Sequence, residues 1–193
     1  IRFEGLPEAI SEGQYLVPRL IREQLEAVIR EPVIRAGAMI DHDLVEQLLN
    51  DSAKESDALP ILQHALMRLW EQAGKQDGMA GSGVHRLTMD LYDSIGRMSN
   101  ALSLHADSVM EELTKSELGS RTERIVEQVM RALIEVDRQN RAIRRPIPFG
   151  QLVRETGFGQ PEIKKVIEAM RAEPCCFLRP GPQDNLEEDT VID

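Results

Sequence analysis

The sequence predicts a mainly α-helical protein, built as a small helical bundle followed by a winged-helix domain with a short β-hairpin. Aliphatic residues recur at intervals of three and four along most of the chain, which is the period of one helical face. Aromatic residues make up only 4% of the 193 residues, which favours aliphatic helix packing over an aromatic-rich β-sandwich. In the last third, a helix, a short extended stretch, two more helices and two strand-like segments follow in the order of a winged helix.

Charge and composition restrict the class of protein. The hydrophobic share of 41% and the charged share of 29% are typical of a globular domain. The formal net charge of −10 argues against general binding to a nucleic-acid backbone, since that binding depends on counterions released by Lys and Arg. No run reaches the roughly 18 apolar residues that span a bilayer, and no signal segment begins the chain. We therefore expect a cytoplasmic protein whose partners are neither nucleic acid nor membrane.

The two ends of the sequence resemble cut ends. Ile1 stands where a methionine would begin a natural chain, and residues 189–193 alternate apolar and polar side chains like a strand that continues. We expect a fragment of a longer protein.

The first predicted elements are short and separated by proline and acidic residues. QYLVP (residues 14–18) suits a strand end or a linker entry. A helix is predicted over residues 21–30, and Pro32 is expected to interrupt it or to start the next one. Asp41 and Asp43 offer N-cap oxygens to a further helix. The apolar stripes of the two helices are Ile21, Leu25, Val28 and Ile29, and Leu44, Val45, Leu48 and Leu49.

A helix that starts at Pro60 is predicted to form the centre of the first bundle, after a polar loop over residues 50–57. Proline suits a first helical turn because its missing N–H would have no partner there. The wide apolar face of this helix comprises Ile61, Leu62, Ala65, Leu66, Leu69 and Trp70. The four glycines of GKQDGMAGSG (residues 74–83) then predict a linker or a surface loop.

Three more helices are predicted in the middle of the chain. A short one over residues 87–95 ends at Gly96. A long one follows, with Leu102, Ala106, Val109 and Leu113 on one stripe. Residues 120–123 (SRTE) fit a capping box, which would open a helix with the apolar face Ile125, Val129, Leu133 and Val136.

The winged-helix prediction rests on the last fifty residues. Two prolines make residues 144–148 extended, and a short helix over residues 149–155 ends at Gly157. Gln160 and Pro161 start another helix, with Ile163, Val166, Ile167 and Met170 expected to be buried. Residues 175–178 and 190–192 are predicted to form two strands joined by a polar loop.

No catalytic or metal-ligating set is visible. The four histidines, His42, His64, His85 and His105, lack metal-ligand spacing with each other or with the cysteines, and we expect His64 and His105 to be structural or partly exposed. Ser103, His105 and Asp107 share one helix, where His105 lies well round from the other two, so they form no triad. Cys175 and Cys176 are adjacent and cannot form an ordinary disulfide, and their role stays open.

A group of basic residues near the C-terminus leaves one alternative open. The group is Arg141, Arg144, Arg145, Lys164 and Lys165. On a DNA-binding winged helix, residues 160–172 would enter the major groove while the arginines grip phosphates. Glu162 and Glu168 lie on the same helix and oppose this reading. We favour ion pairs with another domain as the use of these bases.

Several long blocks of the sequence resemble the novel STAND NTPases, large bacterial signal-transduction ATPases that are often fused to WD-repeat propellers. The blocks include FEGLPEAI from Phe3, GQYLVPR from Gly13, LPILQHALMRLW from Leu59 and ALSLHAD from Ala101. The resemblance covers nearly the whole chain. In that family a P-loop core precedes a helical domain, a winged-helix domain and a sensor, so this chain corresponds to the middle portion.

The resemblance also implies domain boundaries and a nucleotide-facing site. Residues 1–18 would be the end of the nucleotide core or a linker, 19–75 the helical domain, 76–86 a glycine-rich linker or loop, and 87–193 the winged-helix domain with preceding helices. Leu59 and Pro60 lie where the family carries a Gly-x-Pro motif against the nucleotide, with Ala58 in place of the glycine. Tyr15, Val17 and Pro18 would line the adenine side.

The function implied is that of a regulatory segment, which clamps a bound nucleotide and relays an ADP/ATP switch. ATP or ADP would be the cofactor of the parent protein, bound only weakly by this segment alone. We expect no ATP hydrolysis here, because the sequence has no Gly-Lys-Ser/Thr loop and no magnesium ligand. The implied partners are an upstream P-loop core, a downstream sensor and a second copy in the active state. A winged-helix DNA-binding regulator and a protein–protein adaptor without nucleotide remain as alternatives.

Overall fold

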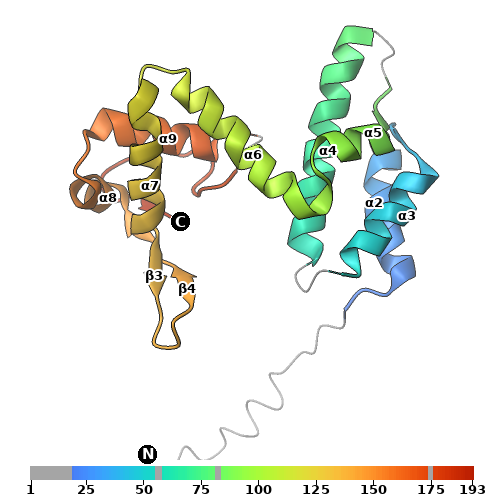
Figure 1. Ribbon diagram of the computed structural model, residues 1–193, viewed down its shortest axis with the longest axis horizontal. Coiled ribbons are helices and arrows are strands. Elements are labelled where there is room, and N and C mark those ends of the chain that lie inside the picture. Colours follow the sequence, from blue (N-terminus) through green and yellow to red (C-terminus); the bar gives the residue numbers. More distant parts are fainter. Residues whose placement is uncertain (1–18, 55–57, 81–83, 174–175) are drawn as a thin grey trace, which may run out of the picture.

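The computed structural model describes residues 19–54, 58–80, 84–173 and 176–193. The protein is mainly helical, with a few two- and three-residue strands, and this confirms the predicted fold class. Its buried side chains form two separate clusters, which we call the first core (residues 29–101) and the second core (residues 109–192). Helix α6 (Arg97–Thr114) belongs to both and runs diagonally from one to the other (Figure 1).

The first core is enclosed by four helices and the start of α6. The helices are α2 (Arg22–Arg35), α3 (His42–Ser52), α4 (Ala58–Ala80) and α5 (Met89–Ser94). Strands β1 (Met39–Ile40) and β2 (Arg86–Leu87) pair in parallel beside them. The predicted stripe of α3 is confirmed, since Leu44, Val45, Leu48 and Leu49 are all buried.

Two local predictions in this region are wrong because packing outweighs local propensity. Pro32 lies inside α2 and does not interrupt it, since the flanking residues Ile29 and Val33 are anchored in the first core. Asp41 occupies the N-cap of α3 but makes no side-chain cap. Its Oδ1 instead accepts a 3.0 Å hydrogen bond from Nε of Arg86 on strand β2.

Helix α4 is longer than its composition suggests. It continues to Ala80, through much of the segment predicted as a glycine-rich linker, and residues 81–83 lie outside the described part. The imidazole of His85 lies edge-on to Trp70 with 4.7 Å between ring centroids, and it also lies beside Gly74. The first core includes residues on both sides of 76–86, so the buried clusters divide within α6 instead.

The predicted stripe of α6 is confirmed at Val109 and Leu113, but in the first half of the helix the buried residues are Ala101 and His105, one position before the predicted Leu102 and Ala106. Met98, Ala101, His105, Val109 and Leu113 are buried, whereas Leu102 is 54% exposed. One continuous face of α6 therefore contacts both cores, the first through Ala101 and the second through Val109. His105 lies at the centre of that face.

The second core is formed by α7 (Thr122–Ala132), α8 (Phe149–Thr156) and α9 (Gln160–Arg171) with the end of α6. Gly157 ends α8 in a left-handed conformation, as predicted. All four residues expected to be buried on α9 are buried, namely Ile163, Val166, Ile167 and Met170. Strand β5 (Ile147–Pro148) pairs antiparallel with β6 (Val191–Ile192), which places residues 191–192 beside the segment that precedes α8.

Three predictions about the second core are wrong. The predicted capping box does not form, because Gly119–Arg121 makes a 3₁₀ turn and α7 begins at Thr122, whose hydroxyl donates to the carbonyls of Gly119 and Leu113. The helix ends at Ala132, and Val136 is 64% exposed on a strand. No strand forms over residues 176–178, where Cys176 has a φ of +50°; residues 174 and 175 lie outside the described part.

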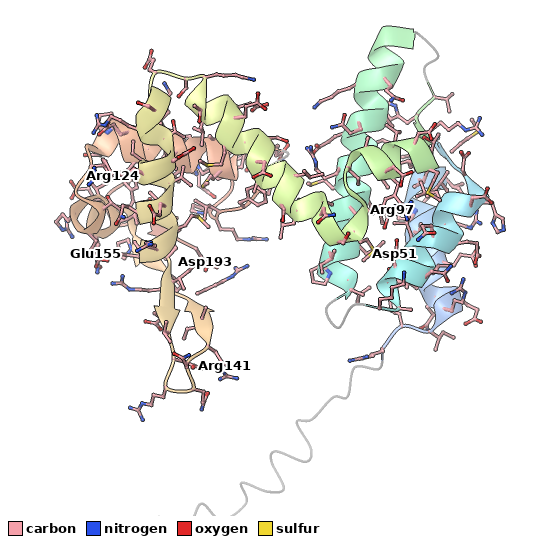
Figure 2. The ribbon with its side chains drawn as sticks, viewed as in Figure 1. Asp51, Arg97, Arg124, Arg141, Glu155 and Asp193 are labelled. Carbon is pink, nitrogen blue, oxygen red and sulfur yellow. The ribbon has the colours of Figure 1, made fainter. Side chains whose placement is uncertain are left out.

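A projecting β-hairpin was not predicted. Strands β3 (Ile134–Val136) and β4 (Ala142–Arg144) pair antiparallel and extend away from the helices, with Arg141 near the far end (Figures 1 and 2). Asp137 closes the turn, since its Oδ1 accepts from the backbone N–H groups of Gln139 and Arg141. A side chain that bonds its own backbone two residues on is a turn signal that the sequence carries.

Candidate functional site

A cavity of about 440 Å³ opens where the starts of α2 and α4 meet the end of α3. Such a volume lies within the range of small-molecule sites. Two of the sequence-predicted site residues, Leu59 and Pro60, line it. The remaining lining residues are Arg19, Leu20, Arg22, Leu25, Leu49, Ser52, Ala53 and Ala58.

The first turn of α4 forms one wall of this cavity. Helix α4 begins at Ala58, so Pro60 lies in its first turn, where a missing N–H costs no helical hydrogen bond. The N–H groups of Ala58 and Leu59 have no acceptor within the helix, because an α-helix leaves its first four donors without partners. The positive end of the helix dipole therefore faces the cavity.

The cavity floor is apolar and its rim is cationic. Leu49 is buried at the floor and belongs to the first core, and Leu25 packs against that core. Arg22 is held at the rim, because its Nη2 lies 2.6 Å from Oε2 of Glu46. Arg19 is exposed, and within the described residues it has no ionic partner. The site thus combines an apolar surface with positive charge.

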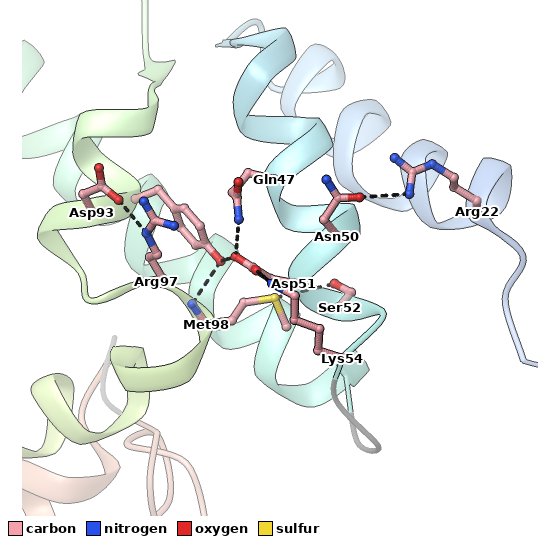
Figure 3. Close-up of polar contacts among 10 residues, drawn as sticks. Arg22, Gln47, Asn50, Asp51, Ser52, Lys54, Asp93, Arg97 and Met98 are labelled. Carbon is pink, nitrogen blue, oxygen red and sulfur yellow. Dashed lines mark hydrogen bonds and ion pairs between the residues drawn. The ribbon is translucent and has the colours of Figure 1, made fainter.

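A polar network behind the cavity fixes the end of α3 (Figure 3). Asp51 accepts hydrogen bonds from Gln47, Lys54 and Tyr92, at 2.9 to 3.0 Å. Burial acts to raise the pKa of the Asp51 carboxyl, but these three hydrogen bonds outweigh it and lower the pKa below its ordinary value. The neighbouring Ser52 donates to Sδ of Met98 at 3.5 Å. The wall that Ser52 contributes is therefore tied to α6.

The other predicted site residues lie next to this cavity in sequence. Tyr15, Val17 and Pro18 fall outside the described residues, and the cavity lining begins directly after them at Arg19. Sequence reasoning missed Arg19, Arg22 and Ser52 as lining residues. Only the apolar stripes of α2 and α3 carried a signal, since they placed Leu25 and Leu49 on inward faces.

The basic residues near the C-terminus are largely neutralised within the chain. Arg141 pairs with Asp137, Arg144 with Asp193, Arg145 with Glu155 and Lys165 with Glu117. Figure 2 shows Asp193 and Glu155 beside the second core and Arg141 apart from them. These arginines and Lys165 therefore form no free cationic surface for a phosphate backbone.

The described residues contain no grouped metal ligands and no membrane-spanning helix. Within residues 19–54, 58–80, 84–173 and 176–193, no three His, Cys, Asp or Glu side chains are grouped so that they could hold a metal ion. Over the same residues, every helix is too short or too polar to cross a bilayer.

The sequence matches a model of a known protein family. The family model described as Novel STAND NTPase 1 matches residues 1–175. Searches of the curated proteins and of the solved structures found no match.

Proposed function

Because the chain belongs to the Novel STAND NTPase 1 family, we propose that it is the regulatory segment of a signalling ATPase and clamps the nucleotide held by a P-loop core. The first core corresponds to the helical domain in this proposal. The second core corresponds to the winged-helix domain, with α7, α8 and α9 as its three helices and the β5–β6 pair as its small sheet. The boundary then falls within α6, and the predicted boundary at residues 76–86 is moved.

The observation that carries the proposal is the cavity at the first turn of α4. The positive dipole end of α4 and the guanidinium of Arg19 suit an anionic ligand such as a phosphate chain, and Arg22, which is paired with Glu46, lies in the same cavity. Leu25, Leu49 and Leu59 offer apolar surface suited to a base or a ribose. Both halves of a nucleotide thus have a chemical counterpart among the residues that line this cavity.

The segment acts as a lid in this proposal and supplies no catalytic group. Phosphoryl transfer requires a phosphate cradle and a bound magnesium ion, and we assign both to the parent core. With ADP bound, the two domains hold the core closed. Exchange for ATP, biased by a sensor domain, releases them and exposes surfaces for self-association. ATP can drive this change only if it binds the open state more tightly than the closed one.

The decisive experiment is a titration of ADP into the parent polypeptide by calorimetry. Arg19→Ala removes a guanidinium from the anion-binding half of the site, and Pro60→Ala removes the ring that fixes the backbone in the first turn of α4; each is expected to weaken binding by about threefold to tenfold. Leu102→Ala is the matched control, since Leu102 is exposed on α6 and outside the cavity. Unchanged ADP affinity in both site variants would remove the assignment and favour the adaptor alternative.

The DNA-binding alternative has weaker support. The paired arginines argue against it, and so does the net charge of −10. A salt-dependent gel shift at about 50 mM salt would support it, because phosphate contacts are strongest at low ionic strength. No shift is expected.

A further inference from the structure

The two cores meet at a cluster of three rings. His64 lies on α4 and His105 on α6, with 5.1 Å between their ring centroids. Phe177, from the segment that follows α9, packs on both, at 4.9 Å from His105 and 6.3 Å from His64. Sequence spacing gave no sign of this contact, because the three residues are far apart in the chain. Phe177, which packs against the second core, therefore also contacts two histidines on helices that enclose the first core.

His105 is buried and His64 is half-buried, and each has a ring nitrogen without a hydrogen-bond partner among the described residues. His105 is 3% exposed and its Nδ1 has no partner within the described residues. Nε2 of His64 is likewise buried and without a partner there, although the imidazole bonds to the backbone of Ala101. A buried neutral nitrogen without a partner is tolerated at modest cost, whereas a buried imidazolium would demand compensation.

A cavity beside the rings separates α4 from α9. Its volume is about 530 Å³, and α4, α6 and α9 contribute its lining, His105 included. Because the two helices are held apart along this cavity, they make little direct contact with each other. The continuous helix α6 joins the two cores, and Phe177 adds a second contact between them, because it reaches from the α9 side to His64 on α4.

Charged groups face the histidines from all three helices. The cations are Arg68 and Lys75 of α4 and Lys165 of α9. The carboxylates around the adjoining cavities are Glu71, Asp107, Glu111, Glu112 and Glu173. Arg68 and Glu71 neutralise each other through a contact of 2.6 Å. The charges of Arg68 and Lys75 both lower the pKa of His105, and the carboxylates do not cancel this effect.

We propose that Phe177 seated on the His64–His105 pair is a proton-sensitive latch, which holds the two cores together while both rings are neutral and releases when the pair takes up a proton. Two imidazolium rings at 5.1 Å would repel each other, and His105, which is only 3% exposed beside Phe177, would carry its charge with little hydration. Withdrawal of Phe177 would admit water to the pair. The inference concerns this chain alone and does not rest on nucleotide binding.

Protonation of the two rings favours the open form over the closed form, as the proposed latch requires. Burial lowers the pKa of His64, and burial with the charges of Arg68, His64 and Lys75 lowers that of His105 to about 4. The closed form therefore binds fewer protons than an open, hydrated form between about pH 6.5 and pH 4. The ratio of open to closed molecules is expected to rise as the pH falls through this window, by about tenfold between pH 7.5 and pH 5.

The test measures the distance between the cores by double electron–electron resonance. Spin labels are attached to Glu31→Cys on α2 and Arg154→Cys on α8, with Cys175→Ser and Cys176→Ser in the background. The wild-type latch should give one narrow distance distribution at about pH 7.5 and a second population at about pH 5. Phe177→Ala should give the second population at both pH values. His42→Gln, a histidine far from the rings, should behave like wild type.

Removal of the titrating rings should abolish the response. His64→Gln with His105→Gln should give the same distribution at both pH values, and His105→Met alone serves if the double variant does not fold. Circular dichroism at both pH values checks that the helices persist. The proposal fails if the wild-type distribution does not change with pH, or if the variants without histidine show the same change.

Discussion

The phenol of Tyr92 donates a 3.0 Å hydrogen bond to Oδ2 of Asp51, although 41 residues separate them in the chain. Its oxygen also accepts from the backbone N–H of Met98 at 3.0 Å. Tyr92 is fully buried, and it thereby joins the end of α3 to the start of α6. Burial and the neighbouring Asp51 carboxylate raise the pKa of the phenol, so it stays a donor at any ordinary pH.

The first prediction concerns this tyrosine. Tyr92→Phe leaves the Met98 N–H without its acceptor and removes one donor from Asp51, so we expect a loss of about 1–3 kcal/mol in the free energy of unfolding. Urea denaturation followed by circular dichroism measures it. Ser108→Ala is the control, because its hydroxyl only bonds back to the Leu104 carbonyl on an exposed face, and it should change stability by less than about 0.5 kcal/mol.

The second prediction compares two glycines with the same backbone handedness. Gly96 has a φ of +82°, and a Cβ there would lie 2.5 Å from Cδ1 of Leu104 and 2.9 Å from Cβ of Asn100. Gly157 has a φ of +71° with open space around it. Gly157→Ala should cost about 1 kcal/mol for left-handed strain alone. Gly96→Ala should cost more than that by about 1 kcal/mol or more, because overpacking is added.

Equal losses in the two alanine variants would contradict the steric account of Gly96. Chemical denaturation of both variants in the same buffer gives the comparison directly.

The third prediction is a pH dependence set by Glu155. Both carboxylate oxygens accept from Arg145, at 2.7 and 2.9 Å. Hydrogen bonds from Arg145 and Gln151 lower the pKa of Glu155 to about 2. A lowered carboxyl pKa gives stability that is present above the ordinary value near 4.5 and is lost as the pH falls towards 2.

Glu155→Gln should therefore reduce stability at neutral pH, and its deficit should shrink as the pH falls from about 4.5 to about 2. Thermal melts across that window measure the deficit. Glu117→Gln breaks the highly exposed pair with Lys165 and should leave the pH profile unchanged. A constant deficit for Glu155→Gln at all pH values would refute the assignment.

The fourth prediction concerns a buried arginine at the end of α9. Arg171 is only 2% exposed; it donates to both oxygens of Glu168 and to the carbonyl of Gly181. Arg171→Met should cost about 2–4 kcal/mol, because the Gly181 carbonyl and Glu168 lose their donors together. Arg131→Met, which breaks an exposed pair with Glu127, should cost less than about 1 kcal/mol. Denaturant unfolding measures the free energy of unfolding of both variants. Similar losses for Arg171→Met and Arg131→Met would show that the burial of Arg171 is unimportant.

Periodicity predicted the helices whose apolar faces meet a single core. The stripes of α3 and α9 became buried as expected, and Gly157 ended α8 where a left-handed residue was needed. These elements are specified locally, because one amphipathic face and one end signal agree. The extended residues before α8 followed in the same way from two prolines.

Local signals failed where distant residues supply the stabilisation. The glycines after Trp70 predicted a break, but α4 continues beside the His85 ring. Leu102 was expected on the buried stripe of α6, yet Ala101 and His105 are buried in its place, because α4 packs on that side of the helix. The β3–β4 hairpin carried a turn signal at Asp137 that the helical pattern around Leu133 obscured.

The candidate site divides in the same way. The sequence alone determined the family, because the match needs only the order of residues along the chain. It also determined the mainly helical class and the position of Leu59 and Pro60 in a first helical turn, because both depend on residues close together in the sequence. Only the tertiary structure brought Arg19 and Ser52 to the same cavity, and Phe177 to His64 and His105. Contacts across tens of residues are set by how whole helices pack, and no local spacing encodes them.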